Sequence, residues 1–151
     1  MGEHAWHKKV REEFFSRQQP NKAYTSHSAV SKLELFRVGT GERLSRKECL
    51  SDADIVVFNG NSEKIAKIIE IESALNPKKI MGIVLATHLC NFCRILKKDY
   101  ELNDIRLDIV FKRAPQRSKK DLKLTIFEPT LQDFINHTKG CISELVFSPQ
   151  D

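Results

Sequence analysis

Three acidic residues interrupt two apolar runs in the middle of the chain, at a spacing that could bring their side chains together. Asp54 precedes the run 55–58, whereas Glu70 and Glu72 end the next apolar run. Glu70 and Glu72 are two residues apart, so in a strand they point to the same face. A turn over residues 59–61, with the sequence Asn-Gly-Asn, would bring Asp54 back beside them.

Three carboxylates at one point repel one another unless a cation lies between them. Clusters of oxygen ligands suit a hard divalent cation, so the sequence predicts a Mg²⁺ site at Asp54, Glu70 and Glu72, with Mn²⁺ as a substitute. The alternative interpretation is structural. In that case Asp54 caps a strand, and the two glutamates pair with Lys or Arg on a solvated face.

The elements that must position these acids follow from the periodicity of the apolar residues. Trp6, Val10 and Phe14 recur every four residues, which predicts an amphipathic helix over 3–17. Asn76 and Pro77 suit the start of a second helix. Helices are predicted over 3–17, 77–97 and 130–139. Strands are predicted over 31–38, 55–58, 65–72, 105–111, 122–127 and 142–147.

A helix is an alternative for 31–38, and the polar stretches 22–29 and 42–53 are interpreted as irregular connections. The order of elements predicts an α/β fold, with a mixed β-sheet flanked by helices. A chain of 151 residues fits a single domain over 1–151.

The order helix, strand, acidic hairpin, helix and strand resembles the core (αβββαβ) of the PD-(D/E)xK nuclease superfamily, the restriction-endonuclease-like fold. The resemblance is carried by Asp54 and by the triplet Glu70-Ile71-Glu72, and its topology covers about residues 5–112. It implies that Asp54 and Glu70 hold the metal ion. Glu72 stands where the family's triplet has Lys, as in the Glu-x-Glu variant that some restriction endonucleases carry.

The resemblance implies two further site residues. Family members often add an acid from the first helix, and Glu13 is the candidate here, with Glu12 and Glu34 behind it. The missing Lys of the triplet leaves the transition-state charge in need of another cation. Lys78 and Lys79 begin the second predicted helix, and Lys78 is the residue assigned to this role.

The predicted function is that of a Mg²⁺-dependent endonuclease that hydrolyses phosphodiester bonds in DNA. Its catalytic residues would be Asp54, Glu70, Glu72 and Lys78. The resemblance also implies a homodimer, because cutting two strands takes two sites. The first alternative is a non-catalytic nucleic-acid-binding or protein-interaction module on the same fold. The second is a small interaction module with another mixed α/β fold.

The overall charge agrees with a polyanionic partner. The 25 Lys and Arg residues exceed the 20 Asp and Glu residues, which gives a net charge of +5 and a pI of about 9.1. The basic stretch 113–120 could contact a phosphate backbone or form a solvated turn. No apolar run approaches the roughly 20 residues of a membrane span, and the N-terminal segment has no apolar signal core, so we expect a cytoplasmic protein.

The cysteines and histidines favour no other chemistry. Cys90 and Cys93, preceded by His88, could be zinc ligands, but no second matching pair completes a tetrahedral site, and core-filling free thiols are the alternative. No glycine-rich phosphate-binding motif occurs in the chain, which disfavours nucleotide hydrolysis of that type.

Overall fold

A computed structural model describes residues 4–25, 34–36, 49–74, 76–89, 92–95, 98–100, 102–113 and 129–151. The labelled helices are α1 (Ala5–Ser16) and α2 (Pro77–Leu89), and a third helix covers residues 129–137. The strands are β1 (Ala23–Thr25), β2 (Glu34–Phe36), β3 (Cys49–Asp52), β4 (Ile55–Phe58), β5 (Ile65–Glu72), β6 (Phe92–Ile95), β7 (Lys98–Tyr100), β8 (Ile105–Lys112) and β9 (Ile142–Gln150).

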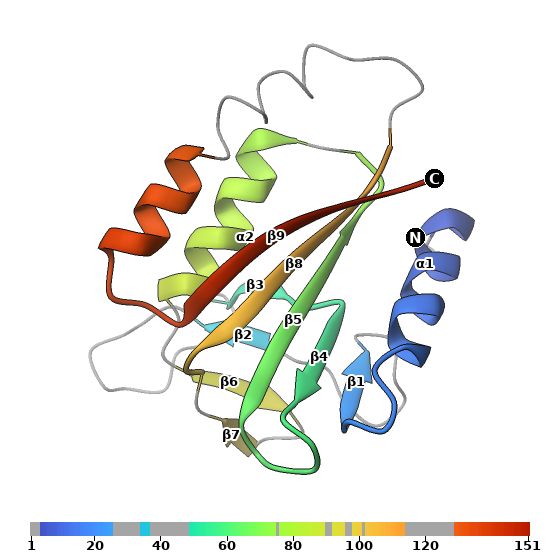
Figure 1. The fold of residues 1–151 in the computed structure, drawn as a ribbon, viewed down its shortest axis with the longest axis horizontal. Coiled ribbons are helices and arrows are strands. Elements are labelled where there is room, and N and C mark those ends of the chain that lie inside the picture. Colours follow the sequence, from blue (N-terminus) through green and yellow to red (C-terminus); the bar gives the residue numbers. More distant parts are fainter. Residues whose placement is uncertain are drawn as a thin grey trace.

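The larger sheet has five strands in the order β1-β4-β5-β8-β9. Pairing is antiparallel from β1 to β5 and parallel from β5 to β9, so the sheet is mixed, as the sequence predicts. The apolar face of α1 packs on one side of it, whereas α2 and the helix over 129–137 pack on the other (Figure 1). The α/β fold class predicted from the sequence is therefore confirmed.

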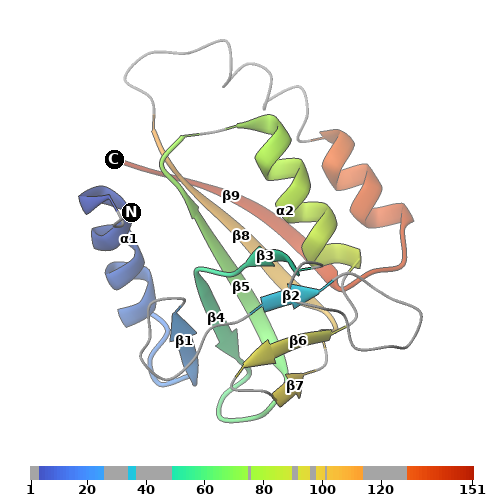
Figure 2. The same ribbon diagram turned by 180° about the vertical axis from the view of Figure 1, so that it is seen from behind.

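A second, smaller sheet has four antiparallel strands in the order β3-β2-β6-β7. Seen from behind, it lies on the same side of the large sheet as α2, which contacts β2 and β3 (Figure 2). Cys93 of β6 and Tyr100 of β7 join the apolar core beneath α2. The large sheet is thus sandwiched between α1 on one face and α2, the third helix and the small sheet on the other.

Most predicted elements are confirmed near the acids. The predicted strands 55–58 and 65–72 have the bounds of β4 and β5, and the strands predicted at 105–111 and 142–147 correspond to β8 and β9. The stretch 31–38 contains β2 and not the alternative helix. The strand predicted over 122–127 lies outside the described residues.

Three predictions for the segments between these elements were wrong. The second helix does not continue to residue 97, because Phe92–Ile95 forms β6 and pairs with β2. Residues 23–25 form β1 along β4, and residues 49–52 form β3 along β2. These short strands carry little apolar periodicity of their own, and pairing with a neighbouring strand determines their conformation.

A buried histidine ties the end of α2 to the segment before β9. The Ile142 N–H donates to Nδ1 of His88 (3.2 Å), so the other ring nitrogen carries the proton and donates to the Thr138 carbonyl (3.0 Å). The Cys141 N–H donates to the His88 carbonyl (2.8 Å). Between these contacts, a Cβ added to Gly140 would clash with the carbonyl oxygen and the ring of His88, so this close approach requires glycine.

We therefore expect Gly140→Ala to lower the free energy of unfolding by about 1–3 kcal/mol, the usual cost of overpacking. Gly82 of α2 is the matched control, since a Cβ added there meets nothing within 4 Å. Gly82→Ala should raise the free energy of unfolding by about 0.5–1 kcal/mol through helix propensity. Urea denaturation of both variants measures the difference, and equal effects would contradict the close approach.

Candidate active site

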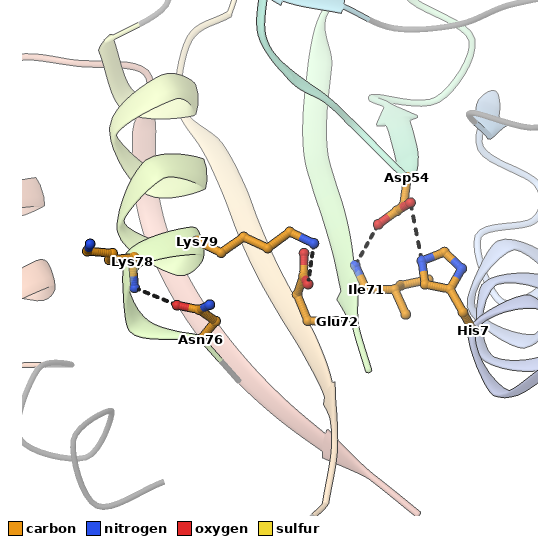
Figure 3. A network of polar contacts seen from close by, with 7 residues as sticks. All are labelled: His7, Asp54, Ile71, Glu72, Asn76, Lys78 and Lys79. Carbon is orange, nitrogen blue, oxygen red and sulfur yellow. Dashed lines mark hydrogen bonds and ion pairs between the residues drawn. The ribbon is translucent and has the colours of Figure 1, made fainter. Parts of the chain in front are cut away.

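The acids at the start of β4 and the end of β5 face each other across the hairpin. The antiparallel register pairs Ile55 with Ile69, so the next position along places Asp54 opposite Glu70. Oδ2 of Asp54 accepts a hydrogen bond from the Ile71 N–H (2.8 Å), which fixes the carboxylate against the end of β5 (Figure 3). The predicted turn that returns Asp54 to the glutamates is confirmed.

Glu70 is an acid in the core. Strand alternation puts it on the same face as Ile68, towards α2, and only 3% of its surface is exposed. Burial raises the pKa of Glu70 well above its usual range, and the neighbouring charges of Asp54 and Glu72 and a side-chain hydrogen bond with Asp54 raise this pKa further. The carboxyl groups of Asp54 and Glu70 thus share a proton or need a shared cation.

Glu72 ends the same strand face and is paired with a cation from α2. Oε2 of Glu72 lies 2.9 Å from Nζ of Lys79 (Figure 3). Burial raises the pKa of Glu72, and the hydrogen bond and charge of Lys79 oppose that rise. The bond to Glu72 in turn raises the pKa of Lys79. The Lys79 side chain is 62% exposed, so the ion pair lies at the boundary between the buried acids and solvent.

Lys79, not the assigned Lys78, is the lysine that the structure brings to the acids. Lys78 is exposed, its N–H donates to the Asn76 side chain at the start of α2 (3.1 Å), and its own side chain points away from the acids (Figure 3). Neighbouring residues on a helix are about 100° apart, so only one of the two lysines can face the strand ends. Both were recognised in the sequence, but the choice between them required the orientation of α2.

The residue that α1 contributes is His7, which the sequence analysis missed. Its Nε2 lies 3.4 Å from Oδ1 of Asp54 (Figure 3). His7 precedes buried Val10 by three residues, so it shares the inward side of the helix, and that spacing was the available signal. The predicted Glu13 is exposed and lies about 9 Å further along the helix axis.

The site therefore consists of two contacting pairs, Asp54 with Glu70 and Glu72 with Lys79, and His7 touches the first pair. Among the residues that the structure describes, no three or more His, Cys, Asp or Glu side chains form a group that could hold a metal ion. The pair Asp54 and Glu70 matches the two positions to which the nuclease resemblance assigns the metal.

The other candidates from the sequence do not form a second site among the described residues. Cys93 and Cys141 are buried free thiols, and Cys90 lies outside the described part. His88 is engaged in the backbone contacts before β9. Most of the basic stretch 113–120 also lies outside the described residues. None of the described helices is long and apolar enough to cross a membrane.

Comparison with known proteins identifies no family. No family model and no solved structure matches the chain. Over 100 residues it is 28% identical to the uncharacterized protein C29B5.04c of Schizosaccharomyces pombe. The aligned part is 66% of this chain, and it covers only 16% of the yeast protein, about a sixth of that relative's length.

Proposed function

We propose that the protein is a metal-dependent endonuclease that hydrolyses phosphodiester bonds in DNA. The observation that carries this proposal is the contact between two carboxyl groups, those of Asp54 and buried Glu70, at the end of the central strand β5. Two carboxyl groups that contact each other in a buried place are costly for a fold, and such clusters are typical of functional sites. A divalent cation in place of the shared proton would give the pair such a function.

The arrangement of elements supports the same proposal. The strand predicted over 31–38 contributes β2 to the small sheet, and β1 takes its place in the large sheet. Without the small sheet, the chain runs α1, β1, β4, β5, α2 and β8. This is the order αβββαβ of the restriction-endonuclease-like core, with three antiparallel strands followed by a parallel one. The acids occupy the start of the second strand and the end of the third, as the resemblance requires.

Two of the residues present offer the carboxylate ligands that a hard divalent cation prefers. Asp54 and Glu70 would hold Mg²⁺ or Mn²⁺ through carboxylate oxygens, and the Glu72 carboxylate lies beside them. When bound, such a cation would polarise a phosphate oxygen and lower the pKa of a water molecule. The pair must lose its shared proton to bind the cation, so we infer that metal affinity rises with pH.

Asp54 and Lys79 would act on the reacting phosphate, and His7 lies beside Asp54. Asp54 is held in place by the Ile71 N–H and lies beside His7. Lys79, whose ammonium group is exposed next to Glu72, would stabilise the negative charge that develops on the phosphate in the transition state. Lys79 thereby supplies, from α2, the cation that the Glu-x-Glu triplet lacks.

One observation favours a second candidate, a non-catalytic nucleic-acid-binding or protein-interaction module on the same fold. Asp54 already lies against the His7 ring and Glu72 is already paired with Lys79, so contacts within the chain offset part of the cost of these acids. Such a module would bind no metal. A homodimer and a cytoplasmic location remain predictions from the sequence.

Cleavage of supercoiled plasmid in Mg²⁺ or Mn²⁺, with EDTA as the blank, tests the proposal. We expect nicked or linear product only with metal. Lys79→Met should slow cleavage about 100-fold, as loss of a transition-state donor does, while the matched variant Lys78→Met should remain within about twofold of the wild type. Cleavage in EDTA, no cleavage in either metal, or equal effects of the two variants would contradict the proposed mechanism.

A further inference from the structure

Cations border the acids at the carboxyl ends of the parallel strands. Glu72 is paired in register with Phe111 of β8, so Lys112 is the next residue beyond the acids on the neighbouring strand. With strands about 4.8 Å apart and a rise of about 3.3 Å per residue, the Cα atoms of Lys112 and Glu72 lie about 6 Å apart. Lys112 and Arg113, which follows it, are both exposed.

An aromatic ring of α1 fixes the first of these cations. Nζ of Lys112 lies 5.9 Å from the centre of the Trp6 ring, within the range of a cation–π contact. Trp6 itself packs against the core beneath α1 and donates from Nε1 to the Asp151 carbonyl (2.9 Å). The ring therefore holds the ammonium group on the α1 face of the sheet at the strand ends, the face from which His7 meets Asp54.

Arg113 is held in place by a backbone hydrogen bond, and its side chain is exposed to solvent. Its N–H donates to the Gln150 carbonyl (2.7 Å), which continues the pairing of β8 with β9. The side chain is 61% exposed, and its Nε lies 3.8 Å from a carboxylate oxygen of Asp151, which is 97% exposed. An ion pair at that distance in solvent is weak, so the guanidinium group can exchange it for a phosphate.

We propose that Lys112 and Arg113 bind the phosphodiester backbone next to the phosphate that reaches Asp54 and Glu70, with Trp6 as a positioning residue for Lys112. This inference rests on the proposed function, of which it names the substrate-binding surface. The acids repel a polyanion, so cations beside them must attract the flanking phosphates. Duplex DNA carries a charge about every 1.7 Å along its axis, so neighbouring phosphates necessarily lie near the strand ends.

Fluorescence anisotropy with a labelled DNA duplex in EDTA tests the surface without cleavage. We expect Lys112→Ala and Arg113→Ala each to weaken binding about 3- to 10-fold. Each should also lower the slope of log affinity against log salt concentration by about 1, the value for one lost phosphate contact. Lys64→Ala is the matched control, because exposed Lys64 precedes β5, about 25 Å from the acids by strand length. Asp54 and Glu70 are unchanged in every variant, so their repulsion cancels in the comparison.

The positioning role of Trp6 has its own test. Trp6→Phe keeps an aromatic ring and should retain affinity and salt dependence, whereas Trp6→Leu should lose the contribution of Lys112. In a chain that already carries Lys112→Ala, Trp6→Leu should have no further effect on the salt dependence. If Trp6 had only a structural role, Trp6→Leu would leave the salt dependence of DNA binding unchanged in the wild-type background as well.

Failure of the surface and failure of the nuclease proposal give different results. A wild-type protein that does not bind DNA, or a Lys64→Ala variant that loses as much affinity as Lys112→Ala, would overturn the surface. If the expected binding losses occur but plasmid is not cut in either metal, the surface stands and the nuclease proposal fails.

Discussion

Asp54→Asn is expected to slow plasmid cleavage by more than about 100-fold. Loss of a residue that only supports a metal ligand costs up to about 100-fold, and loss of a ligand itself should cost more. Asparagine has the same shape, and its side-chain oxygen can still accept the Ile71 N–H that Asp54 accepts now. The substitution therefore removes one negative charge and one proposed metal ligand while it preserves the hairpin. Rates of nicking in Mg²⁺ and in Mn²⁺, compared with calorimetric titration of each metal, measure the two losses together.

The stability of the same variant separates a functional acid from a structural one. Asp54 raises the pKa of Glu70, so removal of its charge should leave the free energy of unfolding unchanged or higher. A variant that folds at least as well as the wild type but neither binds metal nor cleaves is the signature of a strained functional site. If the variant instead cuts at the wild-type rate, the nuclease proposal is wrong.

The hairpin could be predicted from the sequence because its signals are local. The apolar runs of β4 and β5 are bounded by Gly60 on one side and by the acids on the other, and a two-residue period fixes which acids share a face. Its antiparallel register then places Asp54 opposite Glu70. Each of these steps depends on residues close in sequence.

The parts that could not be predicted depend on contacts between distant segments. The strand Phe92–Ile95 continues an apolar helix pattern in the sequence, and only its pairing with β2 makes it a strand. The choice of Lys79 over Lys78 depends on how α2 is rotated against β5. The contact of His7 with Asp54 depends on where α1 crosses the sheet, and the sequence offers several acids and bases on that helix.

The nuclease resemblance expects a lysine at the strand position of Glu72, and in the proposed site that positive charge would come from another element. Glu72 takes that strand position, and Lys79 returns a positive charge to it from the first turn of α2. Glu72 and Lys79 together therefore carry a net charge close to zero. Asp54 and the buried Glu70 stand at the positions to which the resemblance assigns the cation.

Glu70→Gln is expected to stabilise the metal-free protein at neutral and alkaline pH, by about 1–3 kcal/mol at pH 8. Burial and the neighbouring acids raise the pKa of Glu70 above its ordinary value of 4.5. The folded state therefore binds this proton more tightly than the unfolded state does, and wild-type stability falls as pH rises from about 4.5 through the raised pKa. The Gln variant has no such proton, so its advantage should vanish near pH 4 and grow with pH.

Urea denaturation at pH 5 and pH 8, in EDTA and in Mg²⁺, measures this dependence. Mg²⁺ should stabilise the wild type at pH 8 and should not stabilise Glu70→Gln, because a ligand stabilises only the folded state that binds it. Glu13→Gln is the matched control, since Glu13 is an exposed acid whose neutralisation relieves no burial cost. A Glu70→Gln variant that is less stable than the wild type at pH 8 would mean that the Glu70 carboxylate is fully compensated by the protein itself. In that case there is no need for a cation between Asp54 and Glu70, and the non-catalytic alternative gains the stronger support.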